Sequence, residues 1–486
     1  MGGLRYVCVS DLHLGAAYSL LTHTDEEGHL RPKLPGRTLT ALARGLRSTL
    51  PRLSGETPPT LVLMGDALDL GLSSGREVSW AYLRFIDELF PPGVPELFAK
   101  QVIFLPGNHD HHLWRVAQDG LFLEEIAALP EADYQRDTIK RTLLLEPPRL
   151  TCELLTRLMR TRPHLAEAEV KIAYPNLGLV DREASRAVVL HHGHYIDAMY
   201  RAVSRLRTWL TGGTEGPVSV AQIEAENGPW VDFLWSDLGG AGALGHAATS
   251  LYETMLDAGA AHRFADLVAG RILAAGRPYG IASDTPLWRG VTAGGLASGL
   301  IELTLGRAAE SQRNGFATVM NAQEIADLRW YLGGPVVREF QECAMAELPD
   351  DLTFVFGHTH KPFQDQLQVD GWKKPVTIFN TGGWVMDQPT LMPLQGGAIV
   401  LVDDALNVAS LRLFNDPLNG EMPPVRAEGA GGFHDRTNPL LAQLEAALAL
   451  DKADWGAFSA EAEAAIMKRS GIRLDRALDA QAEARP

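Results

Sequence analysis

The chain has 486 residues, of which 46% are hydrophobic and 21% charged, and its formal net charge is −16. This composition is typical of a globular protein that is long enough for more than one domain. The negative charge argues against a large non-specific surface for nucleic acids, although it still allows a local basic groove. Three widely spaced cysteines, Cys8, Cys152 and Cys343, predict no disulfide framework and fit a reducing compartment.

The sequence also predicts neither a membrane span nor an export signal. It contains no run of about 18 apolar residues, the length that a transmembrane helix needs. Its N-terminus lacks a charged segment followed by a long apolar one, and Asp11 ends the first short apolar run. We therefore expect a cytoplasmic protein without a transmembrane segment.

In the first part of the chain, short apolar runs alternate with helical patterns. Runs of β-forming residues predict strands, and apolar residues spaced three or four apart predict helices. Residues 15–35 read as a loop and residues 113–169 as mostly helical. The predicted strands are 4–10, 60–64, 102–105, 170–174 and 187–190, and the predicted helices are 39–50 and 78–90.

After residue 198 the pattern changes to a sequence rich in Ala, Gly and Leu with helical spacing, and strands return near residue 352. Strands are predicted at 352–356, 376–379, 398–402 and 408–414, the last two joined as a hairpin at 403–407. Residues 415–439 read as a loop, and helices follow. The predicted divisions are a core formed by 1–198 and 351–415, a helical insertion at 199–350, and a linker with a C-terminal helical extension at 416–486.

Polar side chains directly follow five of these predicted strands. Carboxylate, imidazole and amide groups together suit divalent ions such as manganese, iron, zinc or cobalt. In Asp-x-His and His-x-His, alternate side chains of an extended segment point the same way, so both can reach one centre. The groups are Asp11 with His13, Asp66 with Asp69, Asn108 with His109, His192 with His194, and His358 with His360.

The number of these ligands is sufficient for two metal ions. Two metals about 3.5–4 Å apart form a common device for in-line displacement at phosphorus. One carboxylate must then bridge them, and Asp66 is the natural candidate. Each motif alone is weak, because a lone His-x-His usually lies on a surface or in a core and Asn108 could be a turn residue.

Taken together and in this order, the motifs resemble those of the calcineurin-like metallophosphoesterase superfamily. The resemblance covers roughly residues 4–200 and 350–415. It implies a four-layer α/β/β/α sandwich with a dinuclear metal site at the strand ends, and the insertion is then a mostly helical addition to this α/β fold. It also implies hydrolysis of phosphoester bonds by a hydroxide that bridges two divalent ions, most commonly manganese.

The resemblance implies a role for each residue. One metal would bind Asp11, His13, Asp66 and His360, and the other Asp66, Asn108, His192 and His358. His109 would be the general acid or a hydrogen-bond donor to phosphate, and Asp69 would orient it. His194 would lie at the rim or bind a metal through its backbone. Arg201 and Arg205, soon after the fourth motif, could hold a phosphate, with a solvated helix face as the alternative.

The insertion should overhang the site as a lid, but the substrate stays open between phosphodiester and phosphomonoester. UDP-2,3-diacylglucosamine hydrolases of this superfamily carry a lid at the same place, which makes a pyrophosphatase acting on a nucleotide-sugar lipid an alternative. That group typically has Arg in place of His109, and this chain is about twice as long. Contact between the insertion and a membrane surface is a related alternative.

Two other classes of function compete with the hydrolase. One is a non-catalytic scaffold on the same fold, but such proteins usually lose metal ligands and none is missing here. The other is a nuclease, which the negative charge and the lack of a basic cluster on the insertion disfavour. The sequence therefore predicts a metallophosphoesterase that acts on a small or lipid-linked phosphoester.

Overall fold

The fold is described from a computed structural model of the chain. It describes residues 2–71, 73–128, 139–211, 219–233, 235, 286–288, 291–292, 319–345, 347–386, 394–415, 422–431 and 437–483. Most of the predicted helices between residues 236 and 318 therefore lie outside the described residues. The described part of that segment is a short antiparallel hairpin of β10 (Pro286–Trp288) and β11 (Val291–Thr292).

The larger of two stacked sheets has eight strands in the order β17-β16-β15-β1-β4-β5-β7-β6. Four of its central strands, β1, β4, β5 and β7, run parallel to one another, and β15 joins β1 antiparallel. The strands are β1 (Leu4–Val9), β4 (Thr60–Leu63), β5 (Gln101–Phe104), β6 (Leu150–Thr151), β7 (Glu169–Ile172), β15 (Gly396–Asp403), β16 (Val408–Asn415) and β17 (Arg426–Glu428).

The smaller sheet has five strands in the order β13-β14-β12-β9-β8. Its inner strands β9, β12 and β14 are parallel, and the two edge strands pair antiparallel with them. The strands are β8 (Asn176–Asp181), β9 (Arg186–His191), β12 (Asp351–Phe356), β13 (Phe363–Leu367) and β14 (Val376–Asn380).

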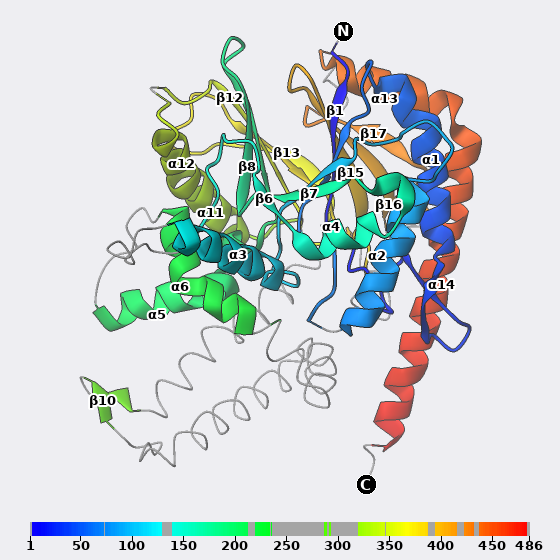
Figure 1. The fold of residues 1–486 in the computed structure, drawn as a ribbon, viewed down its shortest axis with the longest axis horizontal. Helices are drawn as coiled ribbons and strands as arrows, with labels where there is room; N and C mark the ends of the chain where they lie inside the picture. Colours follow the sequence, from blue (N-terminus) through cyan, green and yellow to red (C-terminus); the bar gives the residue numbers. More distant parts are fainter. Residues whose placement is uncertain are drawn as a thin grey trace.

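The two sheets pack face to face through a core of small and branched side chains, among them Cys8, Val62, Val188 and Val355. Helices cover the outer face of each sheet, which gives four layers (Figure 1). Outside the large sheet lie α1 (Arg37–Leu53), α2 (Gly75–Leu89), α4 (Glu153–Arg160), α13 (Pro439–Leu450) and α14 (Lys452–Glu483). Outside the small sheet lie α11 (Ala322–Tyr331) and α12 (Val337–Glu342), joined by a π-helical turn at Leu332–Val336.

Further helices lie at the end of the sandwich where the parallel strands finish, on the side of the small sheet (Figure 1). They belong to the start of the insertion and to the segment after β5, and they pack around the loops described below. They are α3 (His112–Ala128), η2 (His194–Ile196), η3 (Ala198–Arg201), α5 (Ala202–Thr211) and α6 (Val220–Asp232).

The regular elements follow from local sequence. In α1 the residues spaced by three or four, Leu39, Leu42, Leu46 and Leu50, are all buried, because this stripe faces the large sheet. In α2 the side chain of Ser74 caps the first turn together with Glu77, which satisfies backbone N–H groups that have no helical partner. Both helices begin two or three residues before the predicted start, where the first residues are polar or Gly, and α1 also continues through Pro51 to Leu53.

Some short strands contradict the loop predictions. Within 15–35, β2 (Thr22–Thr24) pairs with β3 (Leu30–Pro35), and within 415–439, β17 pairs with β16. The strand β3 contains two prolines and is mostly exposed, so its sequence lacks the alternating pattern of a strand. It also packs against α2. The described residues of the segment 113–169, predicted as mostly helical, contain β6, a short 3₁₀ helix η1 (Pro163–Leu165) and the start of β7 beside α3 and α4.

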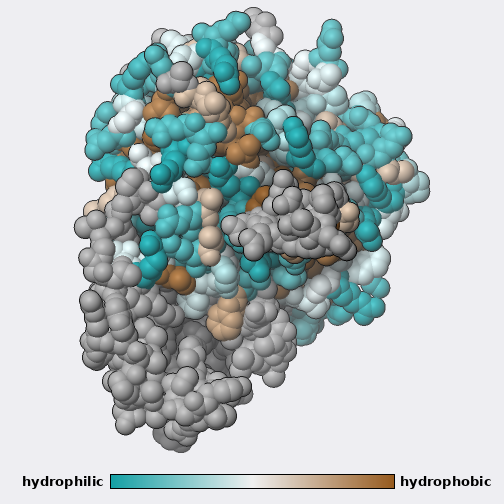
Figure 2. Space-filling view, turned by 60° about the vertical axis from the view of Figure 1, so that its left-hand side comes forward, coloured by the Kyte–Doolittle hydropathy of each residue, from teal (hydrophilic) through white to brown (hydrophobic). Residues whose placement is uncertain are grey.

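The surface in Figure 2 is mostly hydrophilic over the described residues, with smaller hydrophobic patches between the polar ones. Among the described helices, none combines the length and the apolar character needed to cross a membrane.

Candidate metal centre

All five polar groups lie just beyond the carboxyl ends of parallel strands. In the large sheet they follow the neighbouring strands β1, β4 and β5, and in the small sheet the neighbouring strands β9 and β12. Carboxyl ends of adjacent parallel strands meet at one edge, and here the two sheets bring these edges together. Residues separated by more than 300 positions, such as Asp11 and His360, thus become neighbours.

The loops that carry the side chains are tightly curved, not extended. Positive φ angles occur at Asp11 (52°), His13 (45°), Asp66 (49°), His358 (70°) and His360 (55°). The expectation that alternate residues of an extended segment point the same way is therefore wrong. Left-handed residues instead turn each side chain toward the centre, and such strained backbone is typical of functional sites.

Backbone hydrogen bonds hold this curvature in place. The N–H groups of Asp11 and His13 donate to the carbonyl oxygens of Gly65 and Asp66, at 3.0 and 2.9 Å. Gly65 has a φ of 84°, and a Cβ atom there would overlap the His192 ring. The first, second and fourth loops thus approach so closely that only glycine fits at this position.

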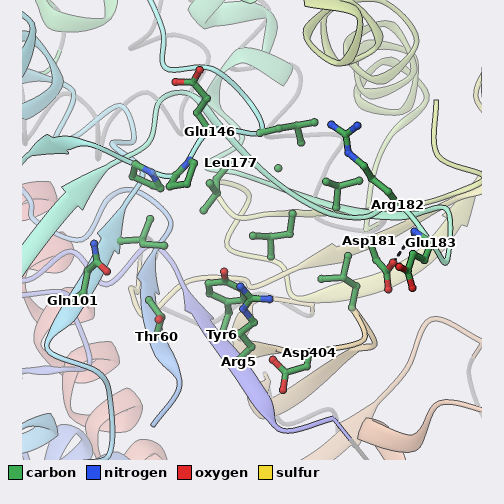
Figure 3. Close-up of a pocket in the computed structure, with 18 residues that line it drawn as sticks. Arg5, Tyr6, Thr60, Gln101, Glu146, Leu177, Asp181, Arg182, Glu183 and Asp404 are labelled. Atoms are coloured by element: carbon green, nitrogen blue, oxygen red, sulfur yellow. Dashed lines mark hydrogen bonds between the residues drawn. The ribbon is translucent and has the colours of Figure 1, made fainter. Parts of the chain in front are cut away.

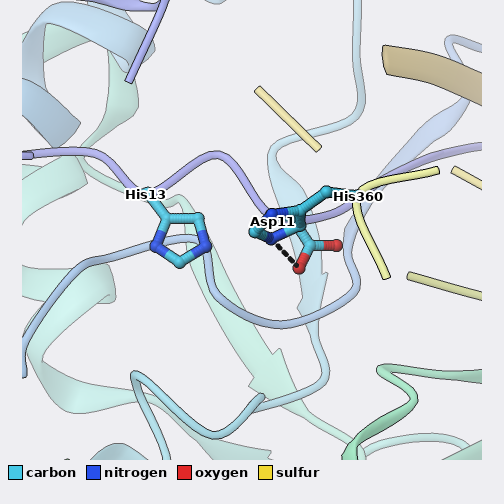
Figure 4. Close-up of side chains that lie close together, drawn as sticks. All are labelled: Asp11, His13 and His360. Carbon is cyan, nitrogen blue, oxygen red and sulfur yellow. Dashed lines mark ion pairs between the residues drawn. The ribbon is translucent and has the colours of Figure 1, made fainter. Parts of the chain in front are cut away.

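The first cluster consists of Asp11, His13 and His360, whose ligand atoms lie within 4.8 Å of one another. His360 Nε2 lies 3.3 Å from Asp11 Oδ1 (Figure 4). Asp11 Oδ2 accepts the N–H of His358 at 2.9 Å, whereas Asp11 Oδ1 and His13 Nε2 are buried atoms without a hydrogen bond. Two buried acceptor atoms that form no hydrogen bond and belong to one group of close ligands fit a bound cation.

The second cluster consists of Asp66, His192 and His358, again with ligand atoms within 4.8 Å. His192 Nδ1 donates to the Met64 carbonyl at 2.9 Å, so its Nε2 is the acceptor nitrogen when the ring is neutral, as a metal ligand must be. Yet Nε2 faces two further acceptors, Asn108 Oδ1 at 3.0 Å and Asp66 Oδ2 at 3.4 Å. Three acceptor atoms that face one another also fit a cation between them.

Asp66 belongs to the second cluster and also lies close to His13 of the first. Its Oδ1 accepts the backbone N–H of His109 at 2.8 Å, and its Oδ2 lies 3.4 Å from His192 Nε2 and 3.8 Å from His13 Nε2. Burial favours the protonated carboxyl, but the imidazoles of His192, His109 and His13 hold the pKa of Asp66 well below its usual range. This carboxylate is ionised and faces both sets of ligands.

Asp69 forms the polar contacts beside these clusters. Its Oδ1 lies 3.2 Å from His109 Nδ1, its Oδ2 lies 3.3 Å from His13 Nδ1, and the Tyr18 hydroxyl also donates to Oδ2. Although burial opposes ionisation, His109 and His13 lower the pKa of Asp69, so the carboxylate can only accept. Both imidazoles must therefore donate from Nδ1, which leaves Nε2 as the free acceptor while they are neutral.

The family comparison agrees with this geometry. Residues 4–250 match the model of the calcineurin-like phosphoesterases. The chain belongs to this family. A comparison with curated proteins finds no match. The matched segment includes the first four groups of this phosphoesterase centre, and the fifth group, His358 with His360, lies beyond it. Members of the family typically bind divalent metals, and the two clusters supply such ligands.

Some residues at the phosphoesterase centre were not predicted as functional. Asp110 accepts N–H groups from Gly107 at 2.7 Å and Ala67 at 2.8 Å, and thereby fastens the second loop to the third. Burial and the Asp66 carboxylate raise the pKa of Asp110 to about 7, against the pull of these N–H groups. Its place directly after Asn108-His109 was the one signal available.

The insertion also contributes to the centre. Trp235, just after α6, packs on the His109 ring with the ring centroids 3.8 Å apart, and its Nε1 donates to the Tyr200 hydroxyl at 3.1 Å. Tyr200 in turn lies edge-on to His358, with centroids 5.3 Å apart. Nothing in the sequence near Trp235 marks it as functional, because only its tertiary contact gives it a role.

A buried carboxylate anchors the insertion below these rings. Glu224 on α6 accepts from Tyr174 at 2.9 Å and from Trp114 Nε1 at 3.1 Å, and the Tyr195 hydroxyl also donates to it. His111 Nε2 lies 3.4 Å away. Trp114 and His111 follow the third metal loop and Tyr195 follows the fourth, so Glu224 links the insertion to both.

The candidate substrate residues lie elsewhere than expected. Arg201 is buried, forms an ion pair with Asp327 at 2.5 Å and lies over the Trp330 ring, so the solvated helix face is wrong for this residue. The rim position is wrong for His194, which is fully buried with Nε2 3.3 Å from the Tyr174 hydroxyl. Arg205 is half-buried on α5. A phosphate contact by any of the three stays a prediction that these positions do not favour.

A separate pocket of about 630 Å³ lies between the two sheets near the opposite ends of the strands (Figure 3). Arg5, Tyr6, Thr60 and Gln101, at the beginnings of β1, β4 and β5, line it together with residues of β8. The candidate metal ligands follow the other ends of these strands, so this pocket is not part of the candidate centre.

Proposed function

We propose that this protein is a dinuclear metallophosphoesterase that hydrolyses phosphodiesters or phosphomonoesters. Asp11, His13, Asp66 and His360 would hold one divalent ion, and Asp66, Asn108, His192 and His358 the other. The supporting observation is Asp66 Oδ2, which faces His13 and His192 from the two clusters at 3.8 and 3.4 Å. Mixed oxygen and nitrogen ligands favour manganese, with iron, zinc or cobalt as alternatives.

Bound there, two cations would neutralise phosphoryl oxygens and ionise a water molecule at neutral pH. Side chains of the protein would supply the remaining catalytic groups. His109 would protonate the leaving oxygen or hold the phosphate by a hydrogen bond. Asp69 would fix the ring of His109, because its Oδ1 accepts from Nδ1 at 3.2 Å and leaves Nε2 for the substrate.

The insertion, residues 199–350, would act as a lid over this centre. Two observations support this: Trp235 packs on His109, and Tyr200 lies beside His358. A ring stacked on the general acid excludes water from it and restricts which leaving groups can approach. No contact of the described residues favours a nucleotide-sugar lipid over other phosphoesters. We therefore propose phosphoesters as the substrate class and no narrower group.

The deciding experiment compares bis-p-nitrophenyl phosphate with p-nitrophenyl phosphate after chelation and re-metallation with manganese. We expect manganese-dependent turnover and two bound ions per chain. In Asp66→Ala, turnover should fall by about 10³-fold or more, the size expected when charge stabilisation is removed. His109→Ala should lose about 10²-fold on esters with poor leaving groups, and much less on p-nitrophenyl esters.

The chain offers a matched control in an exposed loop, where Asp25, Glu27 and His29 also form a group that could bind metal. Asp25→Ala should leave both turnover and the count of tightly bound ions unchanged. Metal binding without turnover on any ester would support the scaffold alternative. Full activity in Asp66→Ala would refute the dinuclear proposal.

A further inference from the structure

The C-terminal helix α14 places one buried arginine against the loop that follows the first metal-binding group. Arg469 donates from Nε to the carbonyl oxygen of Ala17 at 3.1 Å. From Nη2 it donates to the carbonyl oxygens of Ser19 at 2.6 Å and Thr22 at 2.7 Å. One guanidinium thus binds three carbonyl groups of a single loop, residues 17–22.

This arrangement is unusual for a buried cation. A charged group removed from water is costly unless its donors are paired, and a carboxylate is the common partner. Among the described residues, no carboxylate forms an ion pair with Arg469, although 7% exposure leaves it little contact with water. The loop carbonyls therefore take the place of the carboxylate, and the planar guanidinium holds them in a fixed geometry.

The bound loop carries a residue of the phosphoesterase centre. Tyr18 lies between two of the carbonyls that Arg469 holds, and its hydroxyl donates to Asp69 Oδ2. The same Oδ2 accepts from His13 Nδ1 at 3.3 Å, and Oδ1 accepts from His109 Nδ1 at 3.2 Å. Two sets of hydrogen bonds, joined by the backbone and side chain of Tyr18, therefore connect α14 to Asp69. Asp69 in turn binds His13, a candidate metal ligand, and His109, the candidate general acid.

We propose that Arg469 is a positioning residue of the centre and that α14 is the element that holds it. Arg469 fixes the loop 17–22, the loop fixes Tyr18, and Tyr18 fixes the Asp69 carboxylate that orients His13 and His109. The inference rests on the proposed function for the roles of the two histidines. It gives the C-terminal extension a part in the chemistry although no residue of it contacts the metal ligands directly among the described residues.

The test uses the full chain with three substitutions. Arg469→Met removes the three bonds to the loop, and Tyr18→Phe removes only the hydroxyl on Asp69. Lys468→Met is the matched control: this neighbour on α14 donates to the Thr24 carbonyl at 3.2 Å and pairs with an exposed glutamate, outside residues 17–22.

The first readout is hydrogen exchange of the backbone amides in residues 17–22. In Arg469→Met we expect exchange to be faster by at least about tenfold, because three hydrogen bonds to a charged group are lost. The second readout is manganese affinity by calorimetry. Arg469→Met and Tyr18→Phe should both weaken it by about 10- to 100-fold, the size seen for groups that orient metal ligands. Lys468→Met should match the wild type in both.

The third readout is the dependence of kcat on the leaving group across a series of aryl esters. Arg469→Met and Tyr18→Phe should lose more activity on poor leaving groups than on good ones, with KM little changed, because a misaligned acid matters most there. General destabilisation would lower all rates equally. Absence of wild-type turnover would refute the proposed function, while exchange and manganese affinity would still decide this inference.

Either of two results would overturn the inference, and a third would do so through the control. One is wild-type exchange and manganese affinity in Arg469→Met. The other is manganese affinity in Tyr18→Phe equal to that of the wild type, since this variant leaves the fold of α14 intact and tests only the hydroxyl. Equal effects of Lys468→Met and Arg469→Met would likewise assign the change to the stability of the helix.

Discussion

Two segments outside the minimal sandwich reach the Asp69–His109 pair in different ways. From the insertion, Trp235 touches the His109 ring directly. From the C-terminal helix, Arg469 acts through the backbone of a loop and then through Tyr18. The helices concerned, α6 and α14, lie on different sides of the molecule (Figure 1).

The difference indicates a division of tasks. A ring stacked on the outer side of an imidazole controls what can approach it, so the insertion should govern substrate choice. A hydrogen-bond series that ends on a carboxylate controls orientation, so the C-terminal helix should govern the rate constant and metal affinity. The experiments below test this division, from the largest expected effect to the smallest.

The largest effect should come from Asp69→Asn, because both segments act on this carboxylate or on its partner. An amide cannot accept from both imidazoles and the Tyr18 hydroxyl as two carboxylate oxygens do, and its NH₂ group would face a donor. We expect kcat to fall by about 10²-fold or more on esters with poor leaving groups. Asp87→Asn, which weakens ion pairs with Arg84 and Arg162 on another part of the molecule, is the control. A loss below threefold would contradict the orienting role.

The next effect concerns the anchor of the insertion. Glu224→Gln keeps the size of the side chain but replaces one acceptor oxygen by a donor in a buried cluster of donors. The free energy of unfolding should fall by about 2–3 kcal/mol, the size found for hydrogen bonds to a charged group. Denaturant titration measures it. Glu226→Gln, on the same helix and half-buried beside Arg207, should change it by less than about 1 kcal/mol.

The sequence predicted the polar groups that come together in the two clusters, but it did not predict the residues that support them. Each candidate ligand follows a short buried strand. Such a strand and its end can be recognised from a few consecutive residues, as in the run 102–105. Asp66 and Asn108 could be predicted for this reason. The four layers followed from the family resemblance, since alternating strands and helices alone do not divide the strands between two sheets.

The supports could not be predicted because their contacts join distant segments. Glu224 lies in α6 and Trp235 lies just after it, and no motif marks either residue. Arg469 lies about 450 positions from the loop that it holds. Arg201 was a candidate phosphate ligand only because it follows the fourth motif, and its buried partner Asp327 lies 126 positions further along the chain.

A direct test of the insertion is Trp235→Ala. Loss of the ring exposes His109 to water and widens the approach, so we expect KM for large esters to rise by about tenfold, while kcat on small p-nitrophenyl esters changes less. Trp230→Ala is matched to it, because this indole stacks on Phe233 and donates to a backbone carbonyl. Equal losses on small and large esters would mean that Trp235 orients His109 and does not select substrates. The proposed difference between the roles of Trp235 and Arg469 would then be wrong.

The smallest effect concerns Glu339, near the C-terminal end of the insertion. Its protonation should change the stability of the protein without changing the affinity of the centre for metal. Glu339 on α12 is buried and accepts from the Asn176 amide at 2.5 Å. Burial raises its pKa to about 7, while Asn176 and Arg141 favour the ionised form and Glu342 opposes it. Tyr331 is a further neighbour, bound through Asn176.

The sign of the pH dependence follows from this raised pKa. Between about pH 4.5 and 7 the unfolded chain has released the proton of Glu339 and the folded protein has kept it. The folded state then binds more protons, so the free energy of unfolding falls as the pH rises, by at most about 1.4 kcal/mol per pH unit. Glu339→Gln should flatten this slope, whereas Glu347→Gln at an exposed position should keep it. Manganese affinity should be unchanged in both variants, because Glu339 accepts from Asn176 and Glu347 lies near Lys373, and neither bonds to a candidate metal ligand.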